Sequence, residues 1–193
     1  MGFWTRVRLP PTPLKAPIRL PGMGDQVGVF KYMINPKVTE DNMNIRKAET
    51  KDLSRIAEIY IFNNRINYYP IFKDADFSFG EMQVVSIIDD YFKKEEILKN
   101  IFVFDDGLIK GFVQMNGTEI YKLYVDTCFQ SEGIGCKLIE FAIKEFGADH
   151  LWALEKNTRA VSFYNRHGFQ LTGQKKFEEG TIEYLVELKR GSN

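Results

Sequence analysis

A loop with two glycines is the part of the sequence whose residue types most clearly serve a chemistry. The loop consists of Gln130, Ser131, Glu132, Gly133, Ile134 and Gly135. It follows a predicted strand and opens an apolar, periodic stretch that predicts a helix. The first amides of a helix lack internal partners, and the helix dipole places about half a positive charge there. Because Gly133 and Gly135 leave those amides uncovered, the pattern predicts a phosphate site.

Taken alone, a strand, a G-x-G loop and a helix can also form a purely structural turn. Two other nucleotide-binding motifs fit poorly. The third glycine of the dinucleotide motif would fall at Leu138, and the sequence has no G-x-x-x-x-G-K. A second segment strengthens the functional interpretation. Residues 157–169 follow another predicted strand and form one helix that ends at Gly168.

The two segments together resemble the acetyl-CoA signatures of the GNAT superfamily of N-acetyltransferases. The first match is Gln130-x-x-Gly133-x-Gly135. The second is Asn157-x-x-Ala160-x-x-Phe163-Tyr164-x-x-x-Gly168-Phe169. The resemblance covers residues 44–189 and implies an α/β fold, with a mixed central sheet that splays at the cofactor site and is flanked by helices. It implies acetyl-CoA as cosubstrate and direct attack of a primary amine on the thioester.

The same resemblance implies which residues bind the coenzyme. Backbone amides from Gln130 to Gly135 would hold the pyrophosphate, and Asn157 would bind the pantetheine arm. Main-chain groups at the end of the preceding strand, at Leu123, Tyr124 and Val125, would also face that arm. The Val125 N–H would point toward the thioester oxygen. Asn157 has a simpler alternative role as a helix N-cap, and the two roles are compatible.

Two residues are predicted to be catalytic. Tyr164 would direct its hydroxyl at the coenzyme sulfur, which needs a proton or a hydrogen bond as it leaves. Glu119 resembles the general base of the histone-acetyltransferase branch, acting directly or through water. The alternatives are a tyrosine that packs its ring in the core and an exposed glutamate at a strand start. Tyr121 is expected on the same strand face as Glu119, lining the acceptor site.

The elements that must position these residues follow from hydrophobic periodicity and turn residues. Strands are expected at 44–47, 101–104, 108–115, 118–126 and 150–154, with a closing hairpin at 169–176 and 181–188. Helices are expected after Thr50, around 84–92, at 133–146 and at 158–167. The order is β-α-α-β-β-β-α-β-α-β-β.

Composition bounds the function classes. The chain has 193 residues, with 26 basic and 26 acidic side chains. Residues 1–42 hold six of the basic and three of the acidic ones, so the remainder carries 20 against 23. A mildly acidic body argues against nucleic-acid binding. Two cysteines are too few for a disulfide framework and indicate a reducing, cytoplasmic setting. No apolar run is long enough to span a membrane, and no cluster has metal-ligand spacing.

Residues 1–42 are expected to be a disordered leader before a GNAT domain at 43–193. The segment 9–17 contains four prolines, too many for a helix or central strand. A transit peptide is the alternative, and a start upstream of Met33 or Met43 would also explain the segment.

The acceptor is expected to be a small-molecule or peptide amine, bound by a monomer or homodimer. Residues 63–81 are rich in Tyr and Phe and carry Asp74, Asp76 and Glu81, which suits a cationic amine. These aromatic residues can equally be loop residues folded onto the core. Two other classes stay open: a catalytically idle acyl-CoA-binding sensor, and a nucleic-acid-binding protein driven by the basic leader.

Overall fold

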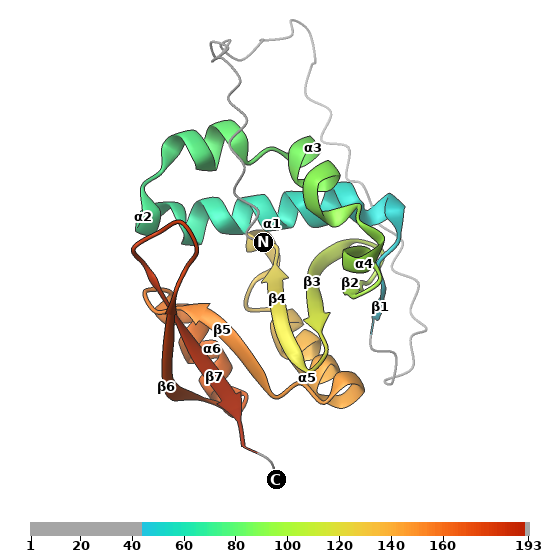
Figure 1. The fold of residues 1–193 in the computed structure, drawn as a ribbon. Coiled ribbons are helices and arrows are strands. Elements are labelled where there is room, and N and C mark those ends of the chain that lie inside the picture. The colour runs from blue at the N-terminus through green and yellow to red at the C-terminus, as the bar shows by residue number, and fades with distance from the viewer. Residues whose placement is uncertain (1–43, 192–193) are drawn as a thin grey trace, which may run out of the picture.

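The chain folds into one mixed sheet with helices on both faces (Figure 1), and the computed structural model describes residues 44–191. The sheet has seven strands in the order β1-β2-β3-β4-β5-β7-β6. This confirms the expected fold class. The predicted leader, residues 1–42, lies outside the described residues.

The strands follow the expected order along the chain. They are β1 (Ile45–Lys47), β2 (Ile101–Asp105), β3 (Ile109–Asn116), β4 (Glu119–Val125), β5 (His150–Leu154), β6 (Phe169–Phe177) and β7 (Tyr184–Arg190). The longer helices are α1 (Leu53–Asn67), α5 (Ile134–Phe146) and α6 (Thr158–Arg166). Short helical segments join α1 to β2, namely α2 (Tyr69–Phe72), η2 (Asp76–Glu81), α3 (Val84–Ile87), η3 (Ile88–Phe92) and α4 (Glu95–Leu98).

The strands β4 and β5 pair only at their beginnings. Glu119 pairs with His150 and Ile120 with Leu151, and these are the two residue pairs between the strands. They are the parallel neighbours in a sheet whose other described pairs are antiparallel. Beyond Ile120, β4 continues to Val125 beside β3 alone. The sheet therefore opens between β4 and β5, next to the start of α5.

Apolar residues fill a core on each face of the sheet. Ile56, Phe92 and Phe112 are fully buried between the sheet and the helices α1 and η3. Leu138 of α5 and Phe169 are fully buried in the core of the opposite face, which α6 also covers. A large buried apolar side chain contributes about 1.5–3 kcal/mol, so these two layers hold the opened sheet in place.

A β-bulge interrupts the alternation of side chains along β4. Met115 of β3 pairs with Ile120, and the next residue back, Gln114, pairs with Lys122. Tyr121 is thus the extra residue, which breaks the two-residue period. As a result Ile120 packs in the α5-side core, while Lys122 reaches tyrosine rings on the α1 side. The prediction that Tyr121 shares a face with Glu119 rested on strict alternation, which this bulge removes.

The aromatic segment after α1 is more helical than the sequence indicated. It folds as α2 and the π-helical η2. Arg65 fixes this segment from α1 by donating to the Ser78 carbonyl at 2.9 Å and to the Met82 carbonyl at 3.0 Å. Its guanidinium also lies 5.3 Å from the ring centre of Phe79. These long-range contacts stabilise turns that local periodicity does not reveal.

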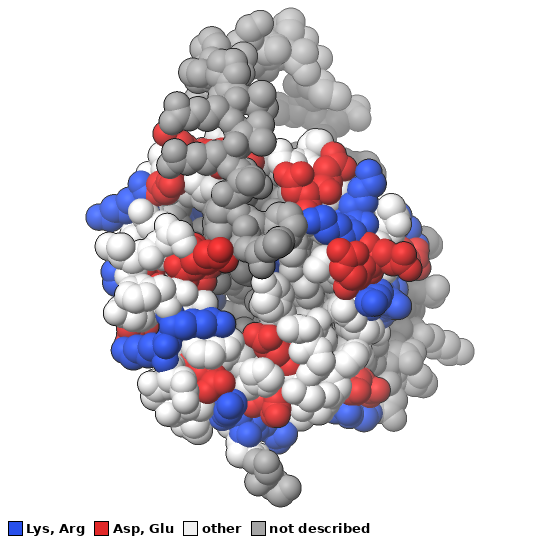
Figure 2. All heavy atoms as spheres, viewed as in Figure 1, with Lys and Arg blue, Asp and Glu red and all other residues white. Residues whose placement is uncertain are grey.

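Charged side chains of both signs are interspersed on the face shown in Figure 2. Among residues 44–191, no helix combines the length and apolar character needed to cross a membrane.

Candidate active site

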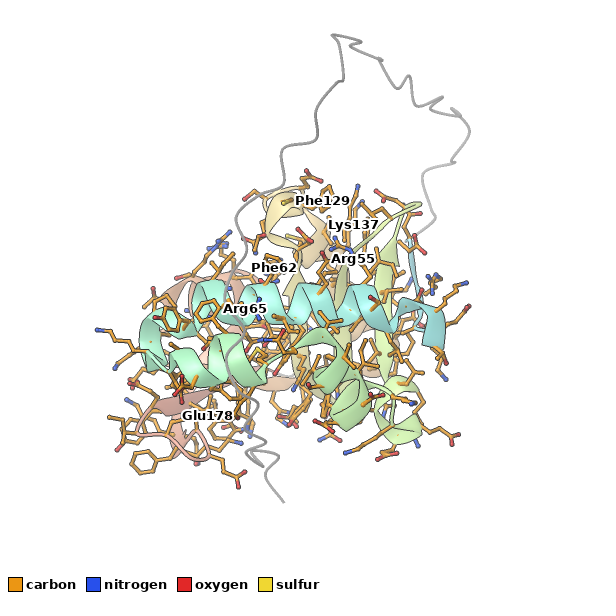
Figure 3. All side chains as sticks on the ribbon, turned by 90° about the horizontal axis from the view of Figure 1, so that it is seen from above. Arg55, Phe62, Arg65, Phe129, Lys137 and Glu178 are labelled. Atoms are coloured by element: carbon orange, nitrogen blue, oxygen red, sulfur yellow. The ribbon has the colours of Figure 1, made fainter. Side chains whose placement is uncertain are left out.

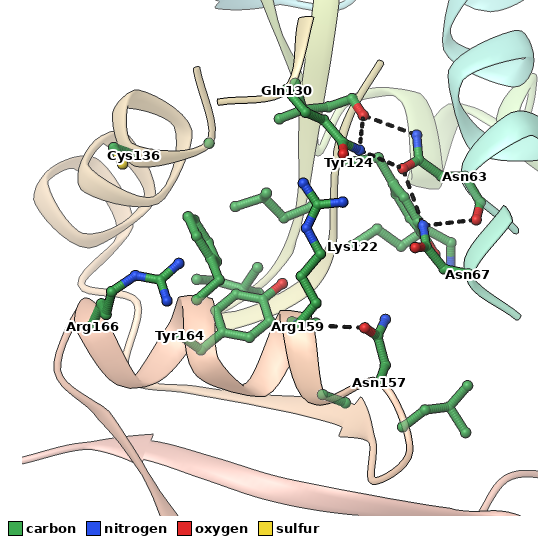
Figure 4. A pocket seen from close by; sticks show the side chains of 18 of the residues that line it. Asn63, Asn67, Lys122, Tyr124, Gln130, Cys136, Asn157, Arg159, Tyr164 and Arg166 are labelled. Carbon is green, nitrogen blue, oxygen red and sulfur yellow. Dashed lines mark hydrogen bonds between the residues drawn. The ribbon is translucent and has the colours of Figure 1, made fainter. Parts of the chain in front are cut away.

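A cavity of about 450 Å³ opens where β4 and β5 diverge (Figure 4). One end is formed by the glycine loop, the middle by α6 and the last residues of β4, and the other end by aromatic and polar side chains. The lining residues on which the following paragraphs depend are Asn63, Tyr68, Tyr121, Lys122, Leu123, Tyr124, Val125, Gln130, Ser131, Gly133, Gly135, Cys136, Trp152, Asn157, Arg159, Phe163, Tyr164 and Arg166.

An ion pair anchors the start of the glycine loop to α1. After Val125 the chain forms a short 3₁₀ turn, Thr127–Phe129, capped by the Asp126 carboxylate, which accepts from the Cys128 N–H at 2.8 Å. The other Asp126 oxygen lies 2.6 Å from an Arg55 nitrogen. Burial acts to raise the pKa of Asp126, but the Cys128 amide and the Arg55 charge outweigh burial and lower it. The loop entry therefore carries a fixed, ionised link to α1.

The carbonyl of Val125 is held by two side chains (Figure 4). Asn63 donates its Nδ2 to this oxygen at 3.0 Å, and Gln130 donates its Nε2 at 3.2 Å. Gln130 also lies 3.4 Å from the Asn63 Oδ1. The side chain of Gln130 thus serves the loop itself and leaves its backbone for a ligand. Because Asn63 is buried, this network fixes the direction in which the chain leaves β4.

The two glycines of the loop favour its conformation for different structural reasons. Gly133 is the N-cap of α5 and has φ of +82°, in the left-handed region that favours glycine. A Cβ on Gly135 would lie 3.2 Å from a ring carbon of Phe163. Gly135 thus allows α5 to pack closely against Phe163 of α6, in addition to leaving an amide uncovered. The helix begins at Ile134, one residue later than expected.

The helix α6 brings polar and cationic side chains to the same cavity. Asn157 caps it by accepting from the Ala160 N–H at 3.2 Å, which confirms the N-cap role. Arg159 and Arg166 also line the cavity. Together with the free amides of the first turn of α5, these two guanidinium groups make the cavity electropositive near α5 and α6. Such an environment suits an anionic, multiply charged ligand.

Tyr164 lies in the middle of the cavity and is nine-tenths buried. Its ring packs against those of Phe163 and Phe169, with centres 5.3 and 6.3 Å away. The hydroxyl forms no hydrogen bond with another residue of the described chain. Burial raises the pKa of Tyr164, so the phenol stays protonated at neutral pH. The ring is buried, and a protonated hydroxyl that has no protein partner and lines the cavity is able to donate to a ligand.

Lys122 lies at the aromatic end of the cavity. Its Nζ is 4.1 Å from the ring centre of Tyr121, 4.9 Å from that of Tyr91 and 5.7 Å from that of Tyr60. Burial lowers the pKa of Lys122 to about 8, against the opposing charges of Glu178 and Glu119. Its ammonium forms no hydrogen bond or ion pair with any residue from 44 to 191.

The two carboxylates near this end differ in position. Glu119 lies at the paired start of β4, accepts from Asn116 at 3.2 Å, and is not part of the cavity lining. Glu178 belongs to the turn between β6 and β7 (Figure 3). Seen from above, Phe129 and Lys137 lie on one side of α1 and Glu178 lies on the other. Burial raises the pKa of Glu178, although Lys122 opposes this effect.

The structure brings most of the predicted site residues to one cavity. The strand end, Gln130, Ser131, both glycines, Asn157 and Tyr164 all line it. Glu132 is not in the lining, and neither is Ile134, which is buried in the α5 core. Sequence reasoning included Asn63 only as the first residue of the acceptor region 63–81, and it missed Lys122, Arg159 and Trp152. The available signals were an asparagine and a lysine inside otherwise apolar patterns.

The residues between 44 and 191 offer no group of three or more acidic, His or Cys side chains that would hold a metal. In a comparison with known families, an acetyltransferase (GNAT) domain model matches residues 78–185, more than half of the chain. Of the predicted sites, this stretch contains both signature segments and both predicted catalytic residues.

Similar proteins agree with this match. A segment of 69 residues is 32% identical to the peptidyl-lysine N-acetyltransferase YjaB of Salmonella typhimurium, and it spans 36% of this chain and 48% of that relative. The fold resembles that of apo YjaB from Escherichia coli, with a TM-score of 0.61 at 19% identity over 75% and 95% of the chains. It also resembles the PaiA N-acetyltransferase of Thermoplasma acidophilum in complex with coenzyme A, with a TM-score of 0.53 at 20% identity over 75% and 97%.

Proposed function

Because the chain belongs to the GNAT acetyltransferase family, we propose that it transfers the acetyl group of acetyl-CoA to a primary amine by direct attack on the thioester. The observation that carries this proposal is the divergence of β4 and β5. It leaves one side of β4 without a strand partner beside the start of α5, and Tyr164 faces the same cavity.

The cavity residues fit the coenzyme in chemical type. The first-turn amides of α5, after Gly133, would hold the pyrophosphate, and Arg159 and Arg166 supply positive charge nearby. The pantetheine arm would lie along the unpaired side of Leu123, Tyr124 and Val125, because an extended amide chain can replace the missing strand. Asn157, already fixed as a cap, would hold the same arm.

Three groups would serve the reaction. The Val125 N–H would donate to the oxyanion that forms as the amine attacks. Tyr164 would give a proton or hydrogen bond to the leaving sulfur. Its raised pKa keeps the hydroxyl protonated at neutral pH and so available as a donor. Glu119 is the proposed base. Since it does not line the cavity, its proton transfer would run through a bridging water.

The test is release of free coenzyme A from acetyl-CoA with a panel of amines, together with calorimetric binding of acetyl-CoA. The panel should include a lysine peptide, because the similar YjaB is named as a peptidyl-lysine N-acetyltransferase. Turnover with any amine would support the proposal. Tight binding of acetyl-CoA without turnover across the panel would favour a sensor that binds the coenzyme and transfers nothing.

A further inference from the structure

Lys122 is a cation inside the candidate site that the reaction above does not use. A direct attack on a thioester needs a neutral amine, an oxyanion donor and an acid for the sulfur. A second ammonium beside the incoming amine would repel it while that amine is protonated. The position of Lys122 therefore calls for a negatively charged group on whatever occupies the aromatic end of the cavity.

No residue from 44 to 191 forms an ion pair with Lys122, although the Glu178 and Glu119 carboxylates are near enough for their charges to act on it. The Lys122 ammonium lies within 4.1–5.7 Å of three tyrosine ring centres. The ring faces attract a cation but leave its N–H donors without acceptors. The β4 bulge directs this side chain into the tyrosine cluster, because regular alternation would place it on the face of Ile120.

We propose that Lys122 binds a carboxylate of the acceptor, so that the substrate is an amino acid or another small amine that carries a carboxylate. This inference rests on the proposed function. A carboxylate is favoured over a phosphate because one lysine balances one negative charge. The two arginines that line the cavity lie on α6 and not on β4 with Lys122.

Glu178 supplies a negative charge to complement the positive charge of Lys122. Its carboxylate has no ion pair or side-chain hydrogen bond within residues 44–191, and its charge acts on Tyr68, Tyr121 and Lys122, all of which line the cavity. It lies on the β6–β7 turn, outside the cavity lining and on the side of α1 away from Phe129 (Figure 3). A ligand with an ammonium and a carboxylate would complement both Glu178 and Lys122.

The test compares matched ligands that differ in the carboxylate alone. L-phenylalanine, L-phenylalaninamide and 2-phenylethylamine, and the corresponding leucine series, are titrated into the full chain by calorimetry at pH 7. Titrations are made with and without coenzyme A. We expect each acid to bind at least 10-fold more tightly than its amide and amine. In Lys122→Met the preference should shrink to within threefold, whereas Lys122→Arg should keep it.

Two further variants separate specific from general effects. Lys93→Met removes an exposed lysine paired with Asp89 and should leave the preference unchanged. Glu178→Gln should weaken the binding of acids and amines alike, because both kinds of ligand carry the ammonium group. Circular dichroism and melting curves check that Lys122→Met is folded, and if it is not, Lys122→Arg against Lys122→Gln provides the same comparison.

The inference is overturned if the wild type binds the amide or amine as tightly as the acid, or if none of the acids binds. It is also overturned if Lys122→Met keeps the preference, or if a lysine peptide with blocked ends is the best ligand. Failure of the proposed function appears separately, as absent acetyl-CoA binding or absent thiol release. The ligand titrations without coenzyme remain decisive in that case.

Discussion

The side-chain amide of Asn63 donates to the Val125 carbonyl at 3.0 Å, across 62 positions of sequence. This bond joins the middle of α1 to the last residue of β4, where the chain turns into the glycine loop. Asn63 also donates to the Ile59 carbonyl at 2.9 Å within its own helix. The first helix therefore positions the glycine loop directly, in addition to covering the sheet.

Replacing Asn63 with Leu should destabilise the fold and weaken coenzyme binding together. Without the Asn63 donor, the Val125 carbonyl keeps only Gln130 as a partner. We expect this to lower the free energy of unfolding by about 1–3 kcal/mol. Urea unfolding measures the first effect and acetyl-CoA calorimetry the second. Asn100→Leu is the control, because Asn100 bonds its own helix at an exposed site. Unchanged stability in Asn63→Leu would show that the bond contributes little.

Gly133→Ala should strain the start of α5. A residue with a Cβ pays roughly 1–2 kcal/mol in the left-handed region, and the loop would relax away from its ligand-binding geometry. We expect a weaker acetyl-CoA affinity, by about tenfold or more. Gly117→Ala has a similar φ of +61° in the β3–β4 turn and open space around it. It should lose comparable stability and keep its affinity. Equal affinities in both variants would remove Gly133 from the proposed phosphate site.

Tyr164→Phe should lower kcat by about 10²–10⁴-fold, or roughly 3–5 kcal/mol in the barrier, if the hydroxyl assists the leaving sulfur. Coenzyme affinity should change little, because the ring still packs against Phe163 and Phe169. Steady-state kinetics and calorimetry separate the two quantities. Tyr184→Phe, at an exposed site on β7, is the matched control. A loss below threefold in kcat would make Tyr164 a packing residue.

Glu119→Gln should reduce turnover mainly at neutral pH. Alkaline solution deprotonates the amine without a base, so the variant should approach the wild type as pH rises. The measurement is kcat against pH from 6.5 to 9.5, with Glu140→Gln, at an exposed position of α5, as the control. Identical profiles for Glu119→Gln and wild type would place the base elsewhere.

The preference for a carboxylate should fall as pH rises through about 8, where Lys122 loses its proton. Burial lowers this pKa, so the charged form binds the carboxylate below that pH and the neutral form above it does not. Other titratable groups surround Lys122. The rings of Tyr60, Tyr91 and Tyr121 lie beside its ammonium, and the charges of Glu119 and Glu178 act on it. The ratio of acid to amine affinity between pH 7 and pH 9 is the measured quantity. A constant ratio would exclude Lys122 as the carboxylate ligand.

More of the cavity lining is predicted from the sequence at the proposed coenzyme end than at the proposed acceptor end. The glycine loop and the 157–169 segment each carry their pattern in consecutive residues, so local reasoning finds them. The position of Lys122 depends on one extra residue in β4, and a bulge of this kind leaves no trace in hydrophobic alternation. The contact of Asn63 with Val125 likewise joins segments that are distant in sequence.

The segment after α1 shows the same limit in another form. Its aromatic and acidic residues predict a connection, yet it folds into α2 and a π-helical turn fixed by Arg65. Helices this short gain most of their stability from tertiary contacts rather than from propensity. Such contacts become visible only when the packed chain is known.

The two residue pairs between β4 and β5 also bear on how long the protein survives in a cell. This short pairing divides the sheet into two parts, one with β1 to β4 and the other with β5 to β7. A coenzyme bound between the two parts would hold them together. At a concentration of 100 times its Kd it would add about 2.7 kcal/mol to the free energy of unfolding. Proteases attack chains that open, so the protein would be degraded faster when acetyl-CoA is scarce. The supply of its cosubstrate would thus set the abundance of the protein as well as its rate.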